Sequence, residues 1–116
     1  METTDLIMLY DYYGDLLTQR QRECFELRYN QDLSLGEIGQ ELGISRQGVY
    51  DNLSRTELQL KNMEEKTGCV RRDLQCRKAI SSVYEAASVL TEHEDPHVVQ
   101  LAMHILRAIE GVKNGI

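Results

Sequence analysis

The chain has 116 residues, 41% of them hydrophobic and 28% charged, which suits one globular domain with an appendage and is unlike a disordered chain. Its 19 acidic and 13 basic side chains give a net charge of −6, which argues against a protein that coats nucleic acid without selectivity. No apolar run approaches the roughly 20 residues of a membrane span, and the acidic N-terminus lacks the basic start of a signal peptide.

The N-terminal segment of the chain predicts two helices. Apolar residues recur at three- and four-residue spacing over residues 5–13, which predicts an amphipathic helix that leaves Tyr12 outward and ends at Gly14. Thr18 opens a capping-box pattern, and this pattern predicts a second helix that runs to about Tyr29.

Two more helices follow and are joined by a tight turn. Ser34 opens a second capping-box pattern, and we expect its helix to end at Leu42 because Gly43 can adopt the positive φ of a helix C-terminus. Ser45 caps the next helix, in which no helix-breaking residue occurs before Gly68.

The helix that begins at Ser45 carries a narrow apolar seam with alternating spacings of four and three residues, which is typical of coiled coils. The seam consists of Val49, Leu53, Thr56, Leu60 and Met63. Two partners fit such a seam: a helix of a second copy, or the C-terminal helices of the same chain. The spacing favours neither over the other.

The C-terminal half predicts a helical pair and a change of charge. Apolar periodicity indicates helices over residues 74–91 and 97–111, and Pro96 suits the start of the second. Residues 1–66 hold 13 acidic and 7 basic side chains, whereas residues 67–116 hold 6 of each. We therefore expect an all-α chain of about six helices, with an N-terminal domain over residues 1–66 and a C-terminal hairpin over residues 67–116 that serves dimerisation or packing.

Residues 34–55 have the spacing of a helix-turn-helix motif. Two helices that cross steeply need a small residue where their backbones meet, and Gly39 takes this position. Gly43 supplies the positive φ of the turn between them. Five apolar residues fill the wedge between the two helices: Ile38, Leu42, Ile44, Val49 and Leu53. The second helix of such a motif presents its first exposed side chains to the major groove of duplex DNA.

The candidate DNA-binding residues on that second helix fall into groups by their chemistry. Arg46 and Gln47 can form hydrogen bonds with the edges of guanine and adenine, so they are the candidate base readers. Tyr50, Asn52 and Arg55 suit contacts with the phosphate backbone.

Two further members of the candidate site, Ser45 and Asp51, act differently. Ser45 caps the helix, and Asp51 faces the groove, where it can accept a hydrogen bond from cytosine but repels phosphates. From Ser34 to Lys61 the motif has three basic and four acidic residues, a net charge of −1, although phosphate contacts supply most non-specific affinity. The motif is therefore either a DNA-binding unit or a rigid scaffold for contacts with another protein.

The chain offers no catalytic constellation, metal site or cofactor motif, so we expect neither an enzyme nor a cofactor. His93 and His97 have a spacing that can suit zinc, but Pro96 lies between them, and we prefer a solvated acidic connection. His97 and His104 are expected to border packing. The chain has three cysteines, namely Cys24, Cys69 and Cys76. Their odd number favours reduced thiols in the cytoplasm, and we expect each to be a small buried hydrophobic residue.

Four stretches of the sequence resemble the YlxM family, small bacterial proteins that are commonly encoded beside the genes of the signal recognition particle. They are residues 9–18 (LYDYYGDLLT), 21–23 (QRE), 33–38 (LSLGEI) and 45–52 (SRQGVYDN). The helix-turn-helix is also similar to region 4 of sigma factors. The resemblance implies an all-helical fold, a homodimer, and one of two roles: a DNA-binding regulator, or an accessory factor of the signal recognition particle.

Overall fold

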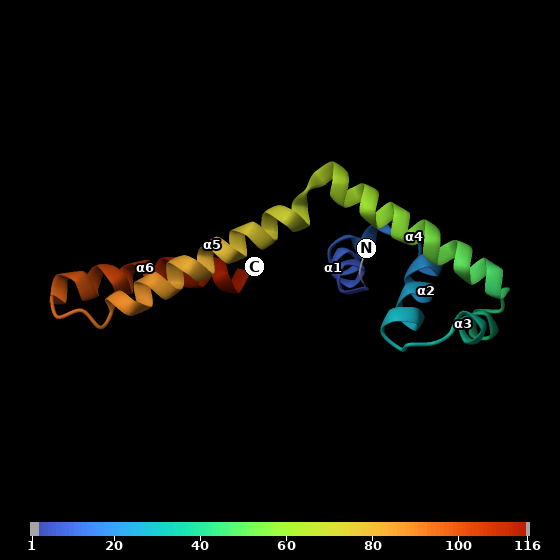
Figure 1. Ribbon diagram of the computed structural model, residues 1–116, viewed down its shortest axis with the longest axis horizontal. Helices are drawn as coiled ribbons and strands as arrows, with labels where there is room; N and C mark the ends of the chain where they lie inside the picture. The colour runs from blue at the N-terminus through green and yellow to red at the C-terminus, as the bar shows by residue number, and fades with distance from the viewer. Residues whose placement is uncertain (1–2, 116) are drawn as a thin grey trace. The chain divides into compact units, whose positions relative to one another are not determined.

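The computed structural model describes residues 3–115, and within that range the protein has six α-helices and no strand (Figure 1). The helices are α1 (Thr3–Tyr13), α2 (Gln19–Tyr29), α3 (Leu35–Leu42), α4 (Arg46–Thr67), α5 (Cys69–Leu90) and α6 (Pro96–Gly115), with a short 3-10 helix η1 at Gly14–Leu16. The chain divides into two compact units between Val70 and Arg71. The prediction of an all-α fold is confirmed.

The predicted capping residues begin three of these helices. The side chains of Thr18 and Ser34 each accept a hydrogen bond from the backbone N–H three residues further on. In return, the side chains of Gln21 and Glu37 accept from the backbone N–H of Thr18 and Ser34, so both capping boxes are complete. The Ser45 hydroxyl accepts from the backbone N–H of Gly48 at 2.9 Å. Each bond satisfies a donor that the start of a helix leaves unpaired, so the predicted boundaries of α2, α3 and α4 are confirmed.

The fifth helix begins at Cys69, five residues before the start expected from periodicity. Its first N–H groups are satisfied by two side chains of α4: the Thr67 hydroxyl accepts from Cys69 N at 3.3 Å, and Glu64 Oε1 accepts from Val70 N at 3.0 Å. Gly68 joins the two helices with φ of 62°, a left-handed conformation that glycine adopts without strain. The early start was missed because the capping groups belong to the preceding helix.

The first unit, residues 1–70, has two buried clusters, and both include residues of α4. The cluster at the start of α4 contains Cys24, Leu27, Ile38 and Val49. The cluster towards its end contains Leu6, Leu9, Tyr13, Leu17, Phe25, Leu60 and Val70. Because α1, α2 and α3 all pack on α4 (Figure 1), the core of this unit follows α4 along most of its length.

The apolar seam of α4 packs on the chain's own N-terminal helices, so both partners expected for it were wrong. Leu60 is fully buried in one cluster with Leu6 and Tyr13 of α1, and Val49 is fully buried with residues of α2 and α3. Thr56, in the middle of the seam, is also fully buried. The helix α4 extends beyond the helix-turn-helix, and its later turns are covered by α1.

The second unit contains most of α5 and all of α6, which run antiparallel (Figure 1). In the connection between them, Asp95 N donates to His93 Nδ1 at 3.0 Å, and Asp95 Oδ1 accepts from His97 N at 2.9 Å, which caps α6. His97 and His104 are both exposed, and the expectation that they border packing stays a prediction. The described part of the chain holds no group of three or more His, Cys, Asp or Glu side chains that could hold a metal ion.

The hairpin of α5 and α6 buries little of its own apolar surface. Within residues 71–112, the part of the second unit whose side chains are described, Ala87 and Ala102 alone are buried. Several side chains on the apolar stripes predicted from periodicity stay exposed: Val83, Tyr84, Leu90, Leu101 and Ile105. Cys76 is exposed as well, so the expectation of buried thiols holds for Cys24 and fails for Cys76. Within residues 3–115, no helix has the length and apolarity that a bilayer span requires.

Candidate nucleic-acid interface

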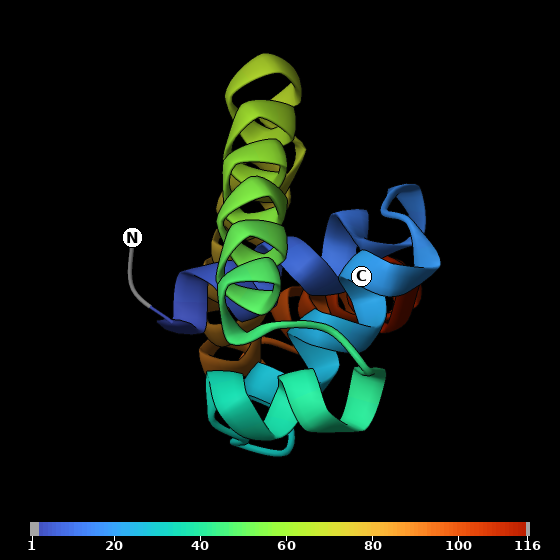
Figure 2. The ribbon, with the colours of Figure 1, turned by 90° about the vertical axis from the view of Figure 1, so that its right-hand side faces the viewer.

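The helices α3 and α4 form the helix-turn-helix that the spacing predicted. Figure 2 shows α3 lying across the start of α4. Gly39 lies at the crossing, where an added Cβ would be only 2.7 Å from the backbone oxygen of Ile44. Gly43 has φ of 71°, and Ile44 N donates to Gly39 O at 3.0 Å across the turn. Both glycines therefore have the predicted roles, one in close backbone approach and one in the turn.

The motif is mounted on α2 through an apolar wedge. Ile38 and Val49 are fully buried together with Cys24 of α2. Burial raises the pKa of the Cys24 thiol, which keeps it a neutral packing group. Half-buried side chains complete the wedge: Leu33, Leu35, Leu42, Ile44 and Leu53. This packing uses one face of α4 and leaves the opposite face of its first turns to solvent.

The candidate residues lie on the solvent side of the first three turns of α4. Most are exposed, namely Ser45, Arg46, Gln47, Tyr50, Asp51 and Arg55, whereas Asn52 is half-buried. Gln47 Nε2 donates to Asp51 Oδ1 at 3.0 Å. The acid that faces the solvent is therefore already engaged by one of the two candidate base readers, and this bond restricts the orientation of the Gln47 amide.

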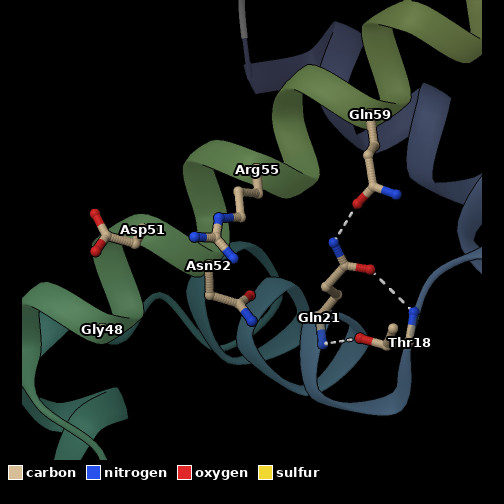
Figure 3. Close-up of a pocket in the computed structure, with 7 residues that line it drawn as sticks. All are labelled: Thr18, Gln21, Gly48, Asp51, Asn52, Arg55 and Gln59. Carbon is tan, nitrogen blue, oxygen red and sulfur yellow. Dashed lines mark hydrogen bonds between the residues drawn. The ribbon is translucent and has the colours of Figure 1, made fainter.

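Part of the candidate site lines an open polar pocket of about 450 Å³ between α4 and the start of α2 (Figure 3). Its lining residues are Thr18, Gln21, Gly48, Asp51, Asn52, Arg55 and Gln59. Figure 3 shows the Arg55 guanidinium reaching over Asn52, while the Asp51 carboxylate points away from both. The side-chain oxygen of Asn52 is buried and has no hydrogen-bond partner among the described residues. The structure thus brings Asn52 and Arg55 together and leaves Arg46 and Tyr50 outside the pocket.

Sequence reasoning missed the far wall of this pocket. Thr18 and Gln21 were interpreted only as a capping box, yet Gln21 is almost fully buried and donates through Nε2 to Gln59 Oε1 of α4. Its own Oε1 accepts from Thr18 N at 3.0 Å. The burial of Gln21 could have been predicted from spacing, because Gln21 lies three residues before Cys24 and so shares the buried face of α2.

Positive charge at the interface comes from few side chains. Among the described residues, neither Arg46 nor Arg55 forms an ion pair with a carboxylate. Lys61, in contrast, pairs with Glu57 at 3.0 Å. Arg20 of α2 donates to the last backbone carbonyl of α3 at 3.2 Å, which adds a cation beside the motif that sequence reasoning did not count. The net negative charge of the motif is therefore unevenly spread, with Arg20 and Arg46 near the turn between α3 and α4.

Known sequences match this chain over most of its length. The sequence profile of the family described as "Putative helix-turn-helix protein, YlxM / p13 like" (UPF0122) matches residues 1–97. A UPF0122 protein of Thermoanaerobacter sp. is 44% identical over 106 residues, which cover 90% of this chain and 91% of that protein. UPF0122 proteins of Caldanaerobacter subterraneus and Bacillus cereus are 51% identical over 80 residues (69% of this chain, 68% of theirs) and 38% identical over 109 residues (94% of both).

Proposed function

Because this chain belongs to the family of YlxM/p13-like helix-turn-helix proteins, we propose that it binds duplex DNA through the start of α4 and regulates gene expression in the cytoplasm. The observation that carries the proposal is a complete motif whose exposed face is rich in side chains that recognise bases and phosphates. The family is described by a helix-turn-helix and not by a reaction, and we assign the chain no catalytic role.

The proposed contacts follow from the positions of the side chains on α4. Arg46 and Gln47, in the first turn, are placed to read base edges in the major groove. Tyr50 and Arg55 are exposed one and two turns further on, where phosphates of the groove wall would pass. The side-chain oxygen of Asn52 is buried, so its proposed phosphate contact would come from its amide N–H groups, which are hydrogen-bond donors.

Fluorescence anisotropy of labelled, mixed duplex fragments at low salt tests this proposal. We expect binding that weakens as salt rises, because phosphate contacts release counterions. Arg46→Ala and Arg55→Ala should each weaken binding, and a lost phosphate contact should lower the salt slope by about 0.9. Arg107→Ala, which removes an exposed arginine of α6, is the matched control. Absence of binding at low salt, or an equal loss in the control, would contradict the proposal.

We also propose that the chain is a homodimer and that the hairpin of α5 and α6 forms the contact. Val83 and Leu90 lie four residues before and three after the buried Ala87, and Ile105 lies three residues after the buried Ala102. Because the two helices are antiparallel, equal offsets from their contact point place side chains on the same face of the hairpin. Residues at three- and four-residue spacing make up this face: Cys76, Ala79, Val83, Ala86 and Leu90 of α5, and Leu101, Ile105, Ala108 and Val112 of α6.

Energetics favour a second copy as the cover of this face. Two buried alanines bury too little apolar area to offset the conformational entropy of ordering two long helices. Pairing of two identical hairpin faces would produce a four-helix bundle with an isologous interface. Residues 67–116 carry equal numbers of acidic and basic side chains, so two copies meet without net repulsion.

Light scattering tests the dimer with a matched pair of substitutions. Ile105→Glu places a charge on the proposed face and should give a monomer. Val89→Glu is the control, since Val89 is 71% exposed and lies away from this face. A dimer that survives Ile105→Glu, or a wild-type chain that is already monomeric, would contradict the proposal.

The alternative proposal is an accessory role in the signal recognition particle pathway, without DNA binding. The observation in its favour is the excess of acidic side chains in residues 1–66, which suits a basic protein partner better than DNA. Co-purification with the particle and a change in its GTP hydrolysis would support this role. A chain that does neither and that binds DNA at low salt would exclude it.

A further inference from the structure

The solvent side of α1 and η1 carries an exposed apolar ridge. Met8, Tyr12 and Leu16 are spaced four residues apart and are 39%, 51% and 69% exposed; we call these three residues the α1 ridge. The exposed charged side chains of the same segment are all acidic: Asp5, Asp11 and Asp15. Residues 1–19 contain no Lys or Arg, so this surface is both apolar and negative.

The α1 ridge is held in a fixed orientation. On the inner side of the same helix, Leu6 and Leu9 are buried in the core. The ring of Tyr12 packs edge-on against the ring of Tyr13, with centroids 5.0 Å apart. Tyr13 is buried in turn and donates its hydroxyl to Glu64 Oε1 of α4 at 2.6 Å. A partner would therefore meet a surface whose backbone and central aromatic ring are already ordered, which lowers the entropic cost of binding.

The acids along the ridge are not neutralised within the protein. Asp15 approaches Arg22 at 3.8 Å, but its side chain is 98% exposed, and such pairs contribute little in water. In the described part of the chain, neither Asp5 nor Asp11 takes part in an ion pair. Their negative charge is thus available to a partner.

We propose that the α1 ridge is a docking site for a basic, amphipathic helix of another protein. The apolar side of such a helix would cover Met8, Tyr12 and Leu16, and its Lys and Arg side chains would reach the flanking acids. Charge argues against the other occupants. Nucleic acid would bring phosphates against the aspartates, and a second copy would bring the same acids together about a two-fold axis.

This docking site is separate from the helix-turn-helix. The α1 helix packs against Leu60 and Met63, in the second half of α4, whereas the candidate DNA-binding residues occupy its first three turns. Figure 1 shows α1 towards the end of α4 that is remote from α3. A protein on the ridge therefore leaves the start of α4 accessible, and the proposal holds whether or not DNA is bound.

Fluorescence anisotropy with a defined probe tests the proposal on the full chain. The probe is a labelled amphipathic helical peptide of leucine and lysine, and the control peptide replaces each lysine by glutamate. We expect the lysine peptide to bind and the glutamate peptide not to bind. Leu16→Ser, and separately the pair Asp11→Asn with Asp15→Asn, should each weaken binding by about tenfold, the change expected when several exposed contacts are lost.

Matched variants show whether the ridge itself is responsible. Leu58→Ser removes a leucine of α4 that is 59% exposed, and Glu41→Gln with Glu65→Gln removes two exposed acids elsewhere in the same unit. We expect neither to change peptide binding. Equal binding of both peptides, equal losses in these controls, or no binding of the lysine peptide would overturn the proposal. Dissociation of a dimer by Leu16→Ser would also overturn it, because a second copy would then be the occupant.

The same variants separate this proposal from DNA binding. Duplex affinity should be unchanged in Leu16→Ser, since Leu16 belongs to η1 and neither lines the polar pocket nor is one of the candidate DNA-binding residues of α4. Failure of the wild-type chain to bind DNA would leave the peptide result intact. Loss of duplex binding in Leu16→Ser together with loss of peptide binding would assign the ridge to nucleic acid and overturn the proposal.

Discussion

The hydroxyl of Tyr13 donates a hydrogen bond of 2.6 Å to Glu64 Oε1, which joins α1 to the end of α4 across 51 positions of the sequence. Since the single hydroxyl proton goes to the carboxylate, Thr67 donates to Tyr13. Glu64 Oε1 also accepts from Val70 N at the start of α5. Burial, followed by the contact with Glu64, raises the pKa of Tyr13, so it stays a neutral donor. The half-buried Glu64 side chain of α4 thus connects α4 to both α1 and α5.

Removal of this hydroxyl should destabilise the first unit. In Tyr13→Phe the ring still packs, but the hydrogen bonds to Glu64 and Thr67 are lost, so we expect the free energy of unfolding to fall by about 1–3 kcal/mol. Urea denaturation followed by circular dichroism measures this change. Tyr50→Phe is the control, because Tyr50 is 55% exposed. Equal stability of Tyr13→Phe and wild type would show that the bond contributes nothing.

The two glycines of α3 should respond in opposite ways to alanine. Gly39→Ala would place a Cβ 2.7 Å from Ile44 O, which forces the backbones apart, and we expect a loss of about 1–3 kcal/mol. At Gly36 the nearest atom, Ser34 Oγ, is 4.0 Å away, so Gly36→Ala should raise stability by up to about 1 kcal/mol through helix propensity. Thermal or urea denaturation distinguishes them. A stabilised Gly39→Ala would contradict the tight crossing.

Leu60 should behave as a core residue and not as an interface residue. It is fully buried within its own unit, so Leu60→Ala should lower the free energy of unfolding by about 2–5 kcal/mol. Leu60→Glu should unfold the first unit and not simply release a folded monomer. Leu58→Ala, at a site that is 59% exposed, should change stability by no more than about 0.5 kcal/mol. A Leu60→Glu variant that is folded and monomeric would contradict this prediction and would favour the seam of α4 as a contact between two copies.

Neutralisation of Asp51 should strengthen DNA binding if the proposed function holds. Asp51→Asn removes a negative charge from the exposed face and can keep the hydrogen bond with Gln47. We expect affinity for mixed duplex fragments to rise by up to about tenfold at low salt, with a smaller gain at high salt. Anisotropy titrations measure both, with Glu110→Gln of α6 as the control. A gain of equal size in the control would point to net charge alone.

Acid should weaken the start of α3 through Glu37. The backbone N–H of Ser34 donates to Glu37 Oε1 at 3.0 Å, and this hydrogen bond lowers the pKa of the Glu37 carboxyl. Because the folded pKa lies below the unfolded value of about 4.3, the stabilisation is present above that value and is lost as pH falls through the folded pKa. Glu37→Gln should therefore be less stable than wild type at neutral pH.

The difference between wild type and Glu37→Gln should shrink in acid. Urea denaturation at neutral pH and at a series of acidic pH values provides the comparison, since the carboxylate takes up its proton as the pH falls through the folded pKa. A difference that is the same at every pH would show that the ionised form of Glu37 has no special role in capping α3.

Local determinants made much of this protein predictable from sequence. Thr18, Ser34 and Ser45 cap helices with bonds that span only three residues, so the boundaries of α2, α3 and α4 could be predicted. The turn required a positive φ at Gly43, and the crossing required a small residue at Gly39. The register of the motif then specified which positions of α4 are exposed, and with them most of the candidate site.

Tertiary structure alone decided which surfaces meet. The three-four spacing around Leu60 shows that one face of α4 requires a cover, but any amphipathic helix of suitable length satisfies that requirement. The choice of α1 depends on contacts such as Tyr13 with Glu64, whose residues are far apart in the chain. The bond between Gln21 and Gln59, which closes the pocket, has the same origin. Periodicity is a property of one helix at a time, whereas packing is a property of pairs, so the pairing could not be predicted from sequence alone.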